Sequence, residues 1–223
     1  WLQHMVYPFK GDGERRTIAA NLCAWHKDNA DNESVINKMY KACKTIADSA
    51  KDIDGSSVVT AMAFNCRNFG VRISGLGDEW ILGPQADVEA KLFDGHSEDE
   101  ITWMGGESII AETVGLGGFA QAAAFPLQQY QGGSADAMVK RNLGLYDITV
   151  GEHSDFHIPY LGYRGTPTAI DVFKVLDTGI LPVMDIGIAG RDGGQIGAGV
   201  VSAPMSVFES ACQKYTDRYK LLR

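Results

Sequence analysis

Hydrogen-bond donors are concentrated at residues 163–171, YRGTPTAID, directly before an apolar helical stretch. Thr168 and Asp171 have the spacing of a T-x-x-D capping box, which predicts that Thr168 caps the helix that follows. The proline between the two threonines favours an extended Thr166, so Arg164 and Thr166 would point out of a loop beside the helix N-terminus. Such a terminus, a hydroxyl and a guanidinium together can bind phosphate or carboxylate. The alternative is an exposed arginine near an ordinary cap.

Charged side chains also interrupt two apolar stretches. Arg72 stands in FGVRISGLGDEW, and because burying a lone guanidinium is expensive, it must pair with a neighbour or bind a ligand. Asp78 and Glu79 are the possible internal partners. Glu107 and Glu112, in GGESIIAET, have the chemistry of a general acid or base. Acids near helix starts more commonly interact with the helix dipole.

The HSDFH segment contains a possible metal site. His153, Asp155 and His157 alternate, so on an extended segment they would share one face. Two imidazoles and a carboxylate suit zinc or iron. Short metal-like patterns often occur by chance, so we favour a polar loop between helices and expect no metal.

Two glycine-rich stretches could bind phosphate groups through backbone N–H groups. Residues 115–120, GLGGFA, fit a loose dinucleotide fingerprint, but no second strand ending in an acid follows, so close helix packing is the better interpretation. Residues 190–199, GRDGGQIGAG, fit either an anion-binding nest or a hairpin turn of small residues.

The periodicity of apolar residues indicates the elements that position these groups. Helices are predicted over 14–28, 32–54, 134–153, 169–179 and 205–222, and strands over 56–64, 69–75, 180–190 and 195–204. Residues 108–133 are predicted as helix, glycine-rich break and helix, and 75–106 as mostly loop. We therefore expect an α+β fold, mainly helical with a small sheet of buried strands.

Composition limits the possible partners. The 223-residue chain has a formal net charge of −8, which disfavours nucleic-acid binding but permits a local site for a small anion. No apolar run is long enough to cross a membrane, and no secretory signal opens the chain. Four scattered cysteines without a CxxC pair favour a reducing cytoplasm.

The ordered motifs SGLGD, RGTPT with its following ID, and GQIGAG resemble the AllG/YlbE-like family over roughly residues 33–210. Members of this family resemble one subunit of a multi-subunit oxamate carbamoyltransferase, which converts oxalurate and phosphate to oxamate and carbamoyl phosphate. The resemblance implies an N-terminal helical arm over 1–32, an AllG-like domain over 33–223, and a missing N-terminal half. It also implies an FdrA-like partner subunit, purine or allantoin catabolism, and an oligomer.

The resemblance gives the candidate residues possible roles in carbamoyl transfer. This reaction needs positioning and oxyanion stabilisation rather than a covalent cofactor, so no cofactor is expected. Arg72, Arg164 and Glu112 are the expected catalytic residues. Arg164, Thr166 and glycine N–H groups would hold phosphate, and Arg72 would hold the oxamate carboxylate. The expected substrate-binding residues are Gly75, Gly77, Asp78, Gly165, Thr166, Thr168, Gly194, Gln195 and Gly197.

Two other functions compete with this hypothesis. The chain could be a non-catalytic scaffold that docks an FdrA-like partner through its small-residue helices. It could also be a metal-dependent hydrolase that uses His153 and His157.

Overall fold

A computed structural model describes residues 32–221 apart from 66, 87, 103–104 and 107. The helices are α3 (Asn32–Asp48), α4 (Ile110–Thr113), α5 (Gln128–Gln131), α6 (Ala135–Leu145), α7 (Val172–Thr178) and α8 (Met205–Tyr219). The strands are β1 (Val59–Asn65), β2 (Asn68–Ile73), β3 (Ile81–Pro84), β4 (Val88–Leu92), β5 (Gly105–Gly106), β6 (Thr149–Ile158), β7 (Arg164–Ile170), β8 (Val183–Ala189) and β9 (Gln195–Ser202). Several short 3-10 turns connect them, including η1 (Ser74–Leu76), η3 (Gly117–Ala123) and η5 (Tyr146–Ile148).

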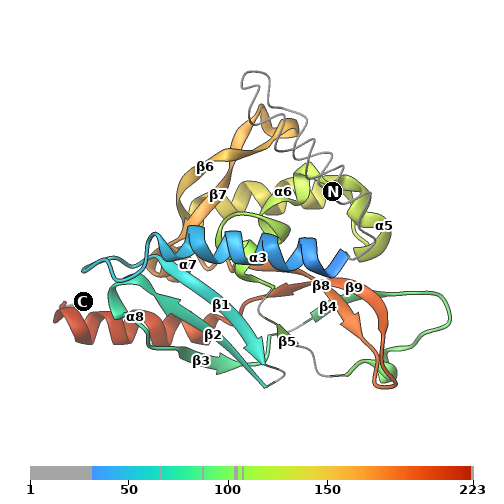
Figure 1. The fold of residues 1–223 in the computed structure, drawn as a ribbon, viewed down its shortest axis with the longest axis horizontal. Helices are drawn as coiled ribbons and strands as arrows, with labels where there is room; N and C mark the ends of the chain where they lie inside the picture. The colour runs from blue at the N-terminus through green and yellow to red at the C-terminus, as the bar shows by residue number, and fades with distance from the viewer. Residues whose placement is uncertain (1–31, 66, 87, 103–104, 107, 222–223) are drawn as a thin grey trace.

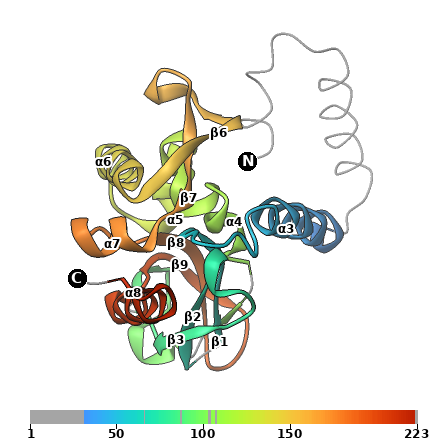
Figure 2. The ribbon, with the colours of Figure 1, turned by 90° about the vertical axis from the view of Figure 1, so that its left-hand side faces the viewer.

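The strands form three antiparallel groups, β3-β2-β1-β5, β4-β9-β8 and the pair β6-β7. In the first sheet, side chains alternate between two faces, as pleating requires. Phe69, Val71 and Ile73 are fully buried on the face that packs against α8, whose Phe208 joins the same core. Ala61 on the opposite face joins a smaller core with α3 and α4. Figure 2 shows α8 and α3 flanking this sheet.

The other two groups surround this body. Sheet β4-β9-β8 lies beside the first sheet, and its Met184 and Ile188 enter the main core. The β6-β7 hairpin projects from the body (Figure 1). The expected α+β class is therefore confirmed, with the strands distributed over several small sheets.

Several predicted elements are correct. The hairpin β1-β2, the strand pair β8-β9, the start of the helix over 32–54 and the C-terminal helix all lie where periodicity placed them. Ser134 caps α6 through its side chain, as predicted, by accepting a hydrogen bond from the Ala137 N–H. The helix predicted over 14–28 lies outside the described residues.

Other predictions were wrong about local structure. Residues 75–106 contain β3 and β4, although a loop was expected. Glycine and proline suggested a loop, but in β3 they occur within a short strand. The helix predicted over 134–153 ends at Leu145, and HSDFH lies in β6 rather than in a loop between helices. The β-branched and aromatic residues after Leu145 favour a strand.

The most consequential correction concerns residues 163–171. The RGTPT motif is strand β7 rather than a loop, and its Thr168 is not a helix cap. The following helix begins at Val172, and the Asp171 carboxylate accepts hydrogen bonds from the Phe173 and Lys174 N–H groups at 2.9 and 3.0 Å. Aspartate is among the best N-cap residues, so the capping box predicted from spacing is displaced by a single cap three residues later.

Candidate functional site

Arg72 lies at the centre of the site formed by the SGLGD motif. It pairs with Ala61 across β1 and β2 and therefore shares the sheet face that looks toward α3. Only 14% of its side chain is exposed. Gly70, on the same face, lets the Trp80 ring lie on the sheet, since a Cβ there would be 3.1 Å from that ring. A nearly buried guanidinium thus stands beside an aromatic wall.

The contacts of Arg72 leave part of its hydrogen-bonding capacity unused. Its Nη2 pairs with the Asp78 carboxylate, and Lys51 Nζ lies 2.8 Å from the same carboxylate oxygen. The guanidinium lies 5.7 Å from the Trp80 ring centroid, within cation–π range. Its Nε is buried and has no hydrogen-bond partner among the described residues. The internal pairing with Asp78 predicted from the sequence is therefore present, but it does not satisfy the whole fork.

The glycines of SGLGD shape the turn that returns Asp78 to Arg72. Gly75 donates its N–H to the Ser56 carbonyl at 2.8 Å, and its carbonyl accepts a hydrogen bond from the Tyr219 hydroxyl at 2.8 Å. A Cβ at Gly75 would be 2.8 Å from each of those two oxygens. Gly77 has a φ of 67°, which favours glycine. Both glycines therefore have a structural reason for their identity.

A cavity of about 440 Å³ lies between α3 and β1, and the Trp80 ring that contacts Arg72 links it to this cluster. Ala61, Ala63 and Ile110 are among the residues that line it, and Trp80 forms one wall. Lys41 and Lys44 also line it. Its size lies in the usual range for small-molecule sites, which are mostly apolar with a few polar groups. The arrangement suits a small anion with an apolar or planar body.

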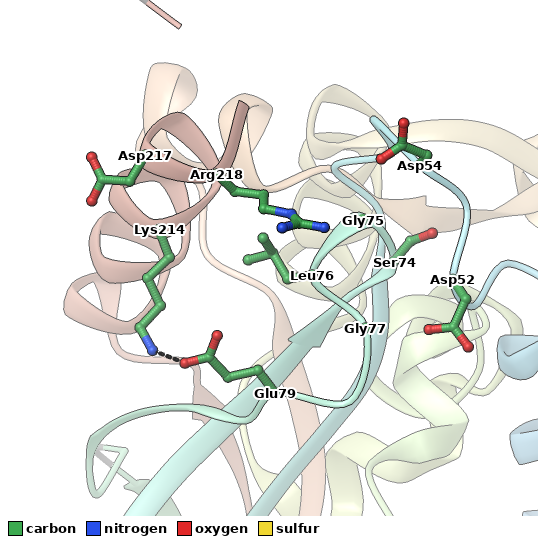
Figure 3. Close-up of a pocket in the computed structure, with 10 residues that line it drawn as sticks. All are labelled: Asp52, Asp54, Ser74, Gly75, Leu76, Gly77, Glu79, Lys214, Asp217 and Arg218. Atoms are coloured by element: carbon green, nitrogen blue, oxygen red, sulfur yellow. Dashed lines mark hydrogen bonds and ion pairs between the residues drawn. The ribbon is translucent and has the colours of Figure 1, made fainter. Parts of the chain in front are cut away.

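A larger cavity, of about 660 Å³, lies on the other side of the SGLGD turn (Figure 3). Gly75 and Gly77 line it, and Arg218 points toward the turn from α8. Lys214 is paired with Glu79. Four acidic side chains against two basic ones make this cavity a poor anion site, namely Asp52, Asp54, Glu79 and Asp217 against Lys214 and Arg218.

Arg164 lies at the start of β7 on the projecting hairpin, rather than in a loop beside a helix N-terminus. Its Nε and Nη2 donate to one Glu152 oxygen at 3.1 and 2.6 Å, and its guanidinium stacks 3.7 Å from the Tyr146 ring centroid. The pairing with Glu152 raises the pKa of Arg164. Gly165 is needed where β7 crosses His153, because a Cβ would be 2.2 Å from the His153 carbonyl oxygen. The structure gives both residues a role within the hairpin.

The two threonines of RGTPT do not flank an anion site at α7. Thr166 is 2% exposed and faces the interior, so the expectation that it points out of a loop was wrong. Its Oγ1 has no hydrogen-bond partner among the described residues. Thr168 lines a different cavity, between α3 and the β6-β7 hairpin. The helix N-terminus invoked for phosphate is already occupied by Asp171.

The GQIGAG motif lies in β9 and the turn before it. Gly194 has a φ of 77° in a turn closed by a hydrogen bond from the Gly190 N–H to the Gly194 carbonyl at 3.1 Å. Gln195 donates to the Gly197 carbonyl at 2.8 Å. A Cβ at Gly197 would be 2.5 Å from the Lys91 carbonyl oxygen of β4. The hairpin-turn interpretation therefore describes the geometry, and these residues lie apart from the Arg72 site.

Glu112 is buried in a polar network within the core. It is 3% exposed, and one of its oxygens accepts hydrogen bonds from the Gly118 and Asp185 N–H groups, each at 3.1 Å. Burial, reinforced by the nearby Asp185 carboxylate, raises the pKa of Glu112 to about 8. Gln121 donates to Asp185, and Arg141 donates to Gln121. Glu107, the other predicted acid, lies outside the described residues.

The HSDFH residues do not form a metal site in the part of the chain that the structure describes. Among those residues, no group of three or more His, Cys, Asp or Glu side chains could hold a metal ion. His153 Nδ1 accepts hydrogen bonds from the Asp155 and Phe156 N–H groups at 3.0 and 3.3 Å. This nitrogen is therefore engaged by the backbone.

Sequence reasoning brought one group of predicted residues together and missed others. Arg72 and Asp78 are in contact, and Gly75 and Gly77 build the turn between them. Lys41, Trp80 and the Gln121–Asp185 pair were not predicted. Asp185 is a lone acid in an apolar strand, the same signal that identified Arg72.

Within the described residues, no helix has both the length and the apolar character to cross a bilayer.

Comparison with known proteins identifies a family. Residues 13–108 match the family described as oxamate carbamoyltransferase subunit AllG. The chain is 40% identical over 179 residues to the uncharacterized protein YahG of Escherichia coli K12, covering 79% of this chain and 38% of YahG. It is 34% identical over 181 residues to the oxamate carbamoyltransferase subunit AllG of the same organism, covering 80% of this chain and 43% of AllG.

A solved structure has the same fold. A conserved protein of unknown function from Enterococcus faecalis V583 superposes with a TM-score of 0.77 at 36% identity, covering 80% of this chain and 43% of that one. The chain thus spans about two fifths of the length of these relatives. With the SGLGD, RGTPT and GQIGAG motifs in order and this structural match, the chain belongs to the AllG-like family.

Proposed function

We propose that this chain is a carboxylate-binding part of a carbamoyltransferase-type complex that acts on oxamate or a close relative. The observation that carries the proposal is the nearly buried Arg72 guanidinium, whose Nε lacks a hydrogen-bond partner among the described residues. It lies against Trp80, which forms a wall of the cavity of about 440 Å³. The AllG relative is named as a subunit of an oxamate carbamoyltransferase. The proposed unit is the AllG-like domain over 33–223.

Exchange of the Asp78 carboxylate for that of a substrate is physically reasonable. The Asp78 side chain is 76% exposed, and exposed ion pairs contribute little to stability. A substrate carboxylate could engage the guanidinium fork through two parallel hydrogen bonds, which are stronger and more specific than a single contact. Lys51, now paired with Asp78, would compensate the displaced carboxylate. The planar oxamate body would lie against Trp80.

The transfer step would need a second component. In carbamoyl transfer to oxamate, the amide nitrogen forms a bond to the carbamoyl carbon and loses a proton, while the C–O bond to phosphate breaks and phosphate leaves with that proton. Hydrogen-bond donors for the phosphate must therefore lie beside the amide nitrogen. Lys41 lines the cavity and has no ion pair among the described residues, which makes it a candidate donor in this chain. We propose that an FdrA-like partner subunit supplies the remaining donors in an oligomeric complex, in purine or allantoin catabolism.

The test combines binding and turnover. Oxamate binding is measured by calorimetry and by Trp80-dependent fluorescence, using Arg72→Met, Arg72→Lys and the matched surface variant Arg67→Met. We expect Arg72→Met to lose at least tenfold in affinity and Arg67→Met to bind normally. Arg72→Lys should recover only part of the affinity, because lysine keeps the charge but lacks the planar fork. Phosphorolysis of oxalurate by the complex reconstituted with its partner should fall in the same order. Unchanged binding and turnover in Arg72→Met would overturn the proposal.

A further inference from the structure

A separate cavity of about 320 Å³ lies between the C-terminal part of α3 and the β6-β7 hairpin. Apolar side chains from α3, β1 and α4 form much of its wall, including Ile46, Val59 and Val114. Its polar lining includes Thr113, His153 and Thr168. It shares no lining residue with the cavity beside Arg72. This cavity therefore needs its own explanation.

His153 presents a hydrogen-bond donor of fixed identity to this cavity. Its Nδ1 accepts hydrogen bonds from two backbone N–H groups, those of Asp155 and Phe156, at 3.0 and 3.3 Å. A neutral imidazole whose Nδ1 accepts must carry its proton on Nε2. The ring also packs on Phe156, with centroids 4.2 Å apart. Desolvation lowers the pKa of His153, which favours the neutral ring.

The Nε2–H group of His153 is not used within the protein. The described residues offer it no hydrogen-bond partner, and the atom is accessible on a side chain that lines the cavity, so it is available to a ligand there. Binding a metal at Nε2 would require the proton to move to Nδ1 or leave the ring. Moving it would break both backbone contacts. The two backbone hydrogen bonds to Nδ1 therefore disfavour a metal at Nε2 and keep Nε2–H as a hydrogen-bond donor.

The hydroxyl groups of the cavity complement this donor. Thr113 donates its own hydrogen to the Ile109 carbonyl at 3.3 Å, so its oxygen can only accept from the cavity. Thr168 has no side-chain hydrogen bond among the described residues. Glu152 also lines the cavity, but its carboxylate forms an ion pair with Arg164. One N–H donor and hydroxyl acceptors, without an unpaired cation, fit a neutral group rather than an anion.

We infer that this cavity binds a neutral small molecule through a carboxamide group. The carboxamide oxygen accepts the His153 Nε2–H, its NH₂ group donates to the hydroxyl oxygens of Thr113 or Thr168, and the apolar wall covers the rest of the ligand. A carboxylate of the same shape lacks the two N–H donors that the hydroxyl oxygens accept. The inference does not depend on the function proposed for Arg72.

The test compares benzamide with benzoate, which have nearly the same shape, by following the ring nitrogens of His153 with NMR. In the free protein, the ring should be the Nε2–H tautomer. Benzamide should shift the His153 signals in a saturable manner, and benzoate should bind at least tenfold more weakly. The opposite tautomer, equal binding of the two probes, or no binding of benzamide at millimolar concentration would overturn the inference.

Variants separate the donor from the local fold. His153→Asn keeps an acceptor for the backbone N–H groups, as asparagine side chains do in turns, but removes the distal donor. His153→Gln restores an N–H near the former Nε2 position. We expect Asn to lose benzamide binding with a melting temperature close to the wild type, and Gln to recover part of the binding. His157→Gln, a control on the same strand, should bind benzamide normally. Normal binding by His153→Asn would contradict the inference.

Discussion

Glu112 is a buried carboxyl whose protonation couples the core to pH. One of its carboxyl oxygens accepts hydrogen bonds from the Gly118 and Asp185 N–H groups, and a Cβ at Gly117 would collide with that oxygen. Burial is the main cause of its raised pKa, and the Asp185 carboxylate adds to it. At neutral pH the group is therefore mostly protonated when the protein is folded. A neutral carboxyl at this position avoids an uncompensated charge in the core.

This raised pKa has a defined consequence for stability. The folded-state pKa of about 8 exceeds the ordinary value of 4.5, so the folded chain binds more protons between these pH values. The stabilisation is complete below pH 4.5 and is lost as pH rises through 8, by at most about 1.4 kcal/mol per pH unit. We predict that Glu112→Gln, which is neutral throughout, gains stability relative to the wild type as the pH rises from about 5.5 to about 8.

Urea unfolding at several pH values measures this difference. Glu209→Gln, on an exposed face of α8, is the matched control and should leave the pH dependence of the wild type unchanged. Parallel stability curves for the wild type and Glu112→Gln would show that Glu112 is already ionised in the folded protein.

At the residue scale, the sequence predicted chemistry well and direction poorly. Arg72 was identified because a charge in an apolar strand demands a partner, and Asp78 is that partner. Asp185 carries the same signal but was not recognised. Thr166 was expected to face solvent but is 2% exposed, since strand alternation rather than loop geometry decides its side. Which face a side chain occupies depends on the neighbouring strand, which spacing alone does not reveal.

At the element scale, the glycines of GQIGAG fit the spacing between β4 and β9. Gly197 and Gly199 stand opposite Leu92 and Ala90. A Cβ at Gly199 would be 2.2 Å from the Glu89 carbonyl oxygen, closer than real Cβ atoms come to any backbone atom. The motif therefore lets two strands approach each other. Among the strands that sequence patterns missed, β4 pairs with β9, more than one hundred residues later, whereas β6 and β7 pair with each other across a short connection.

We predict that Gly199→Ala destabilises the protein, because the strand pair must move apart to admit a methyl group. The expected loss is about 1–3 kcal/mol, the usual range for overpacking, and it is measured by denaturant unfolding. Gly151→Ala in β6 is the matched control, since a Cβ there meets no atom within 4 Å, and its stability should stay close to that of the wild type. Equal stability of the two variants would contradict the packing role of Gly199.

At the scale of the whole molecule, the family motifs lie in separate regions. SGLGD builds the turn beside Arg72, RGTPT runs along the projecting hairpin, and GQIGAG joins β4 to β8. The substrate-binding residues expected from the sequence were drawn from all three motifs, and linear order could not show that three antiparallel groups would separate them. The Arg72 cavity and the His153 cavity instead lie along different parts of α3.

Two cavities of different chemistry predict two separable responses of global stability. A ligand that binds only the folded state stabilises it by about 2.7 kcal/mol at one hundred times its Kd, or roughly 5–10 °C in Tm for a domain of this size. Oxamate carries both a carboxylate and a carboxamide, whereas its ethyl ester keeps only the carboxamide. Stabilisation by oxamate should fall in Arg72→Met and survive largely in His153→Asn. The ester should show the reverse dependence, which thermal unfolding of the same four protein–ligand pairs would measure. Loss of both responses in either single variant would mean that the two cavities form one site.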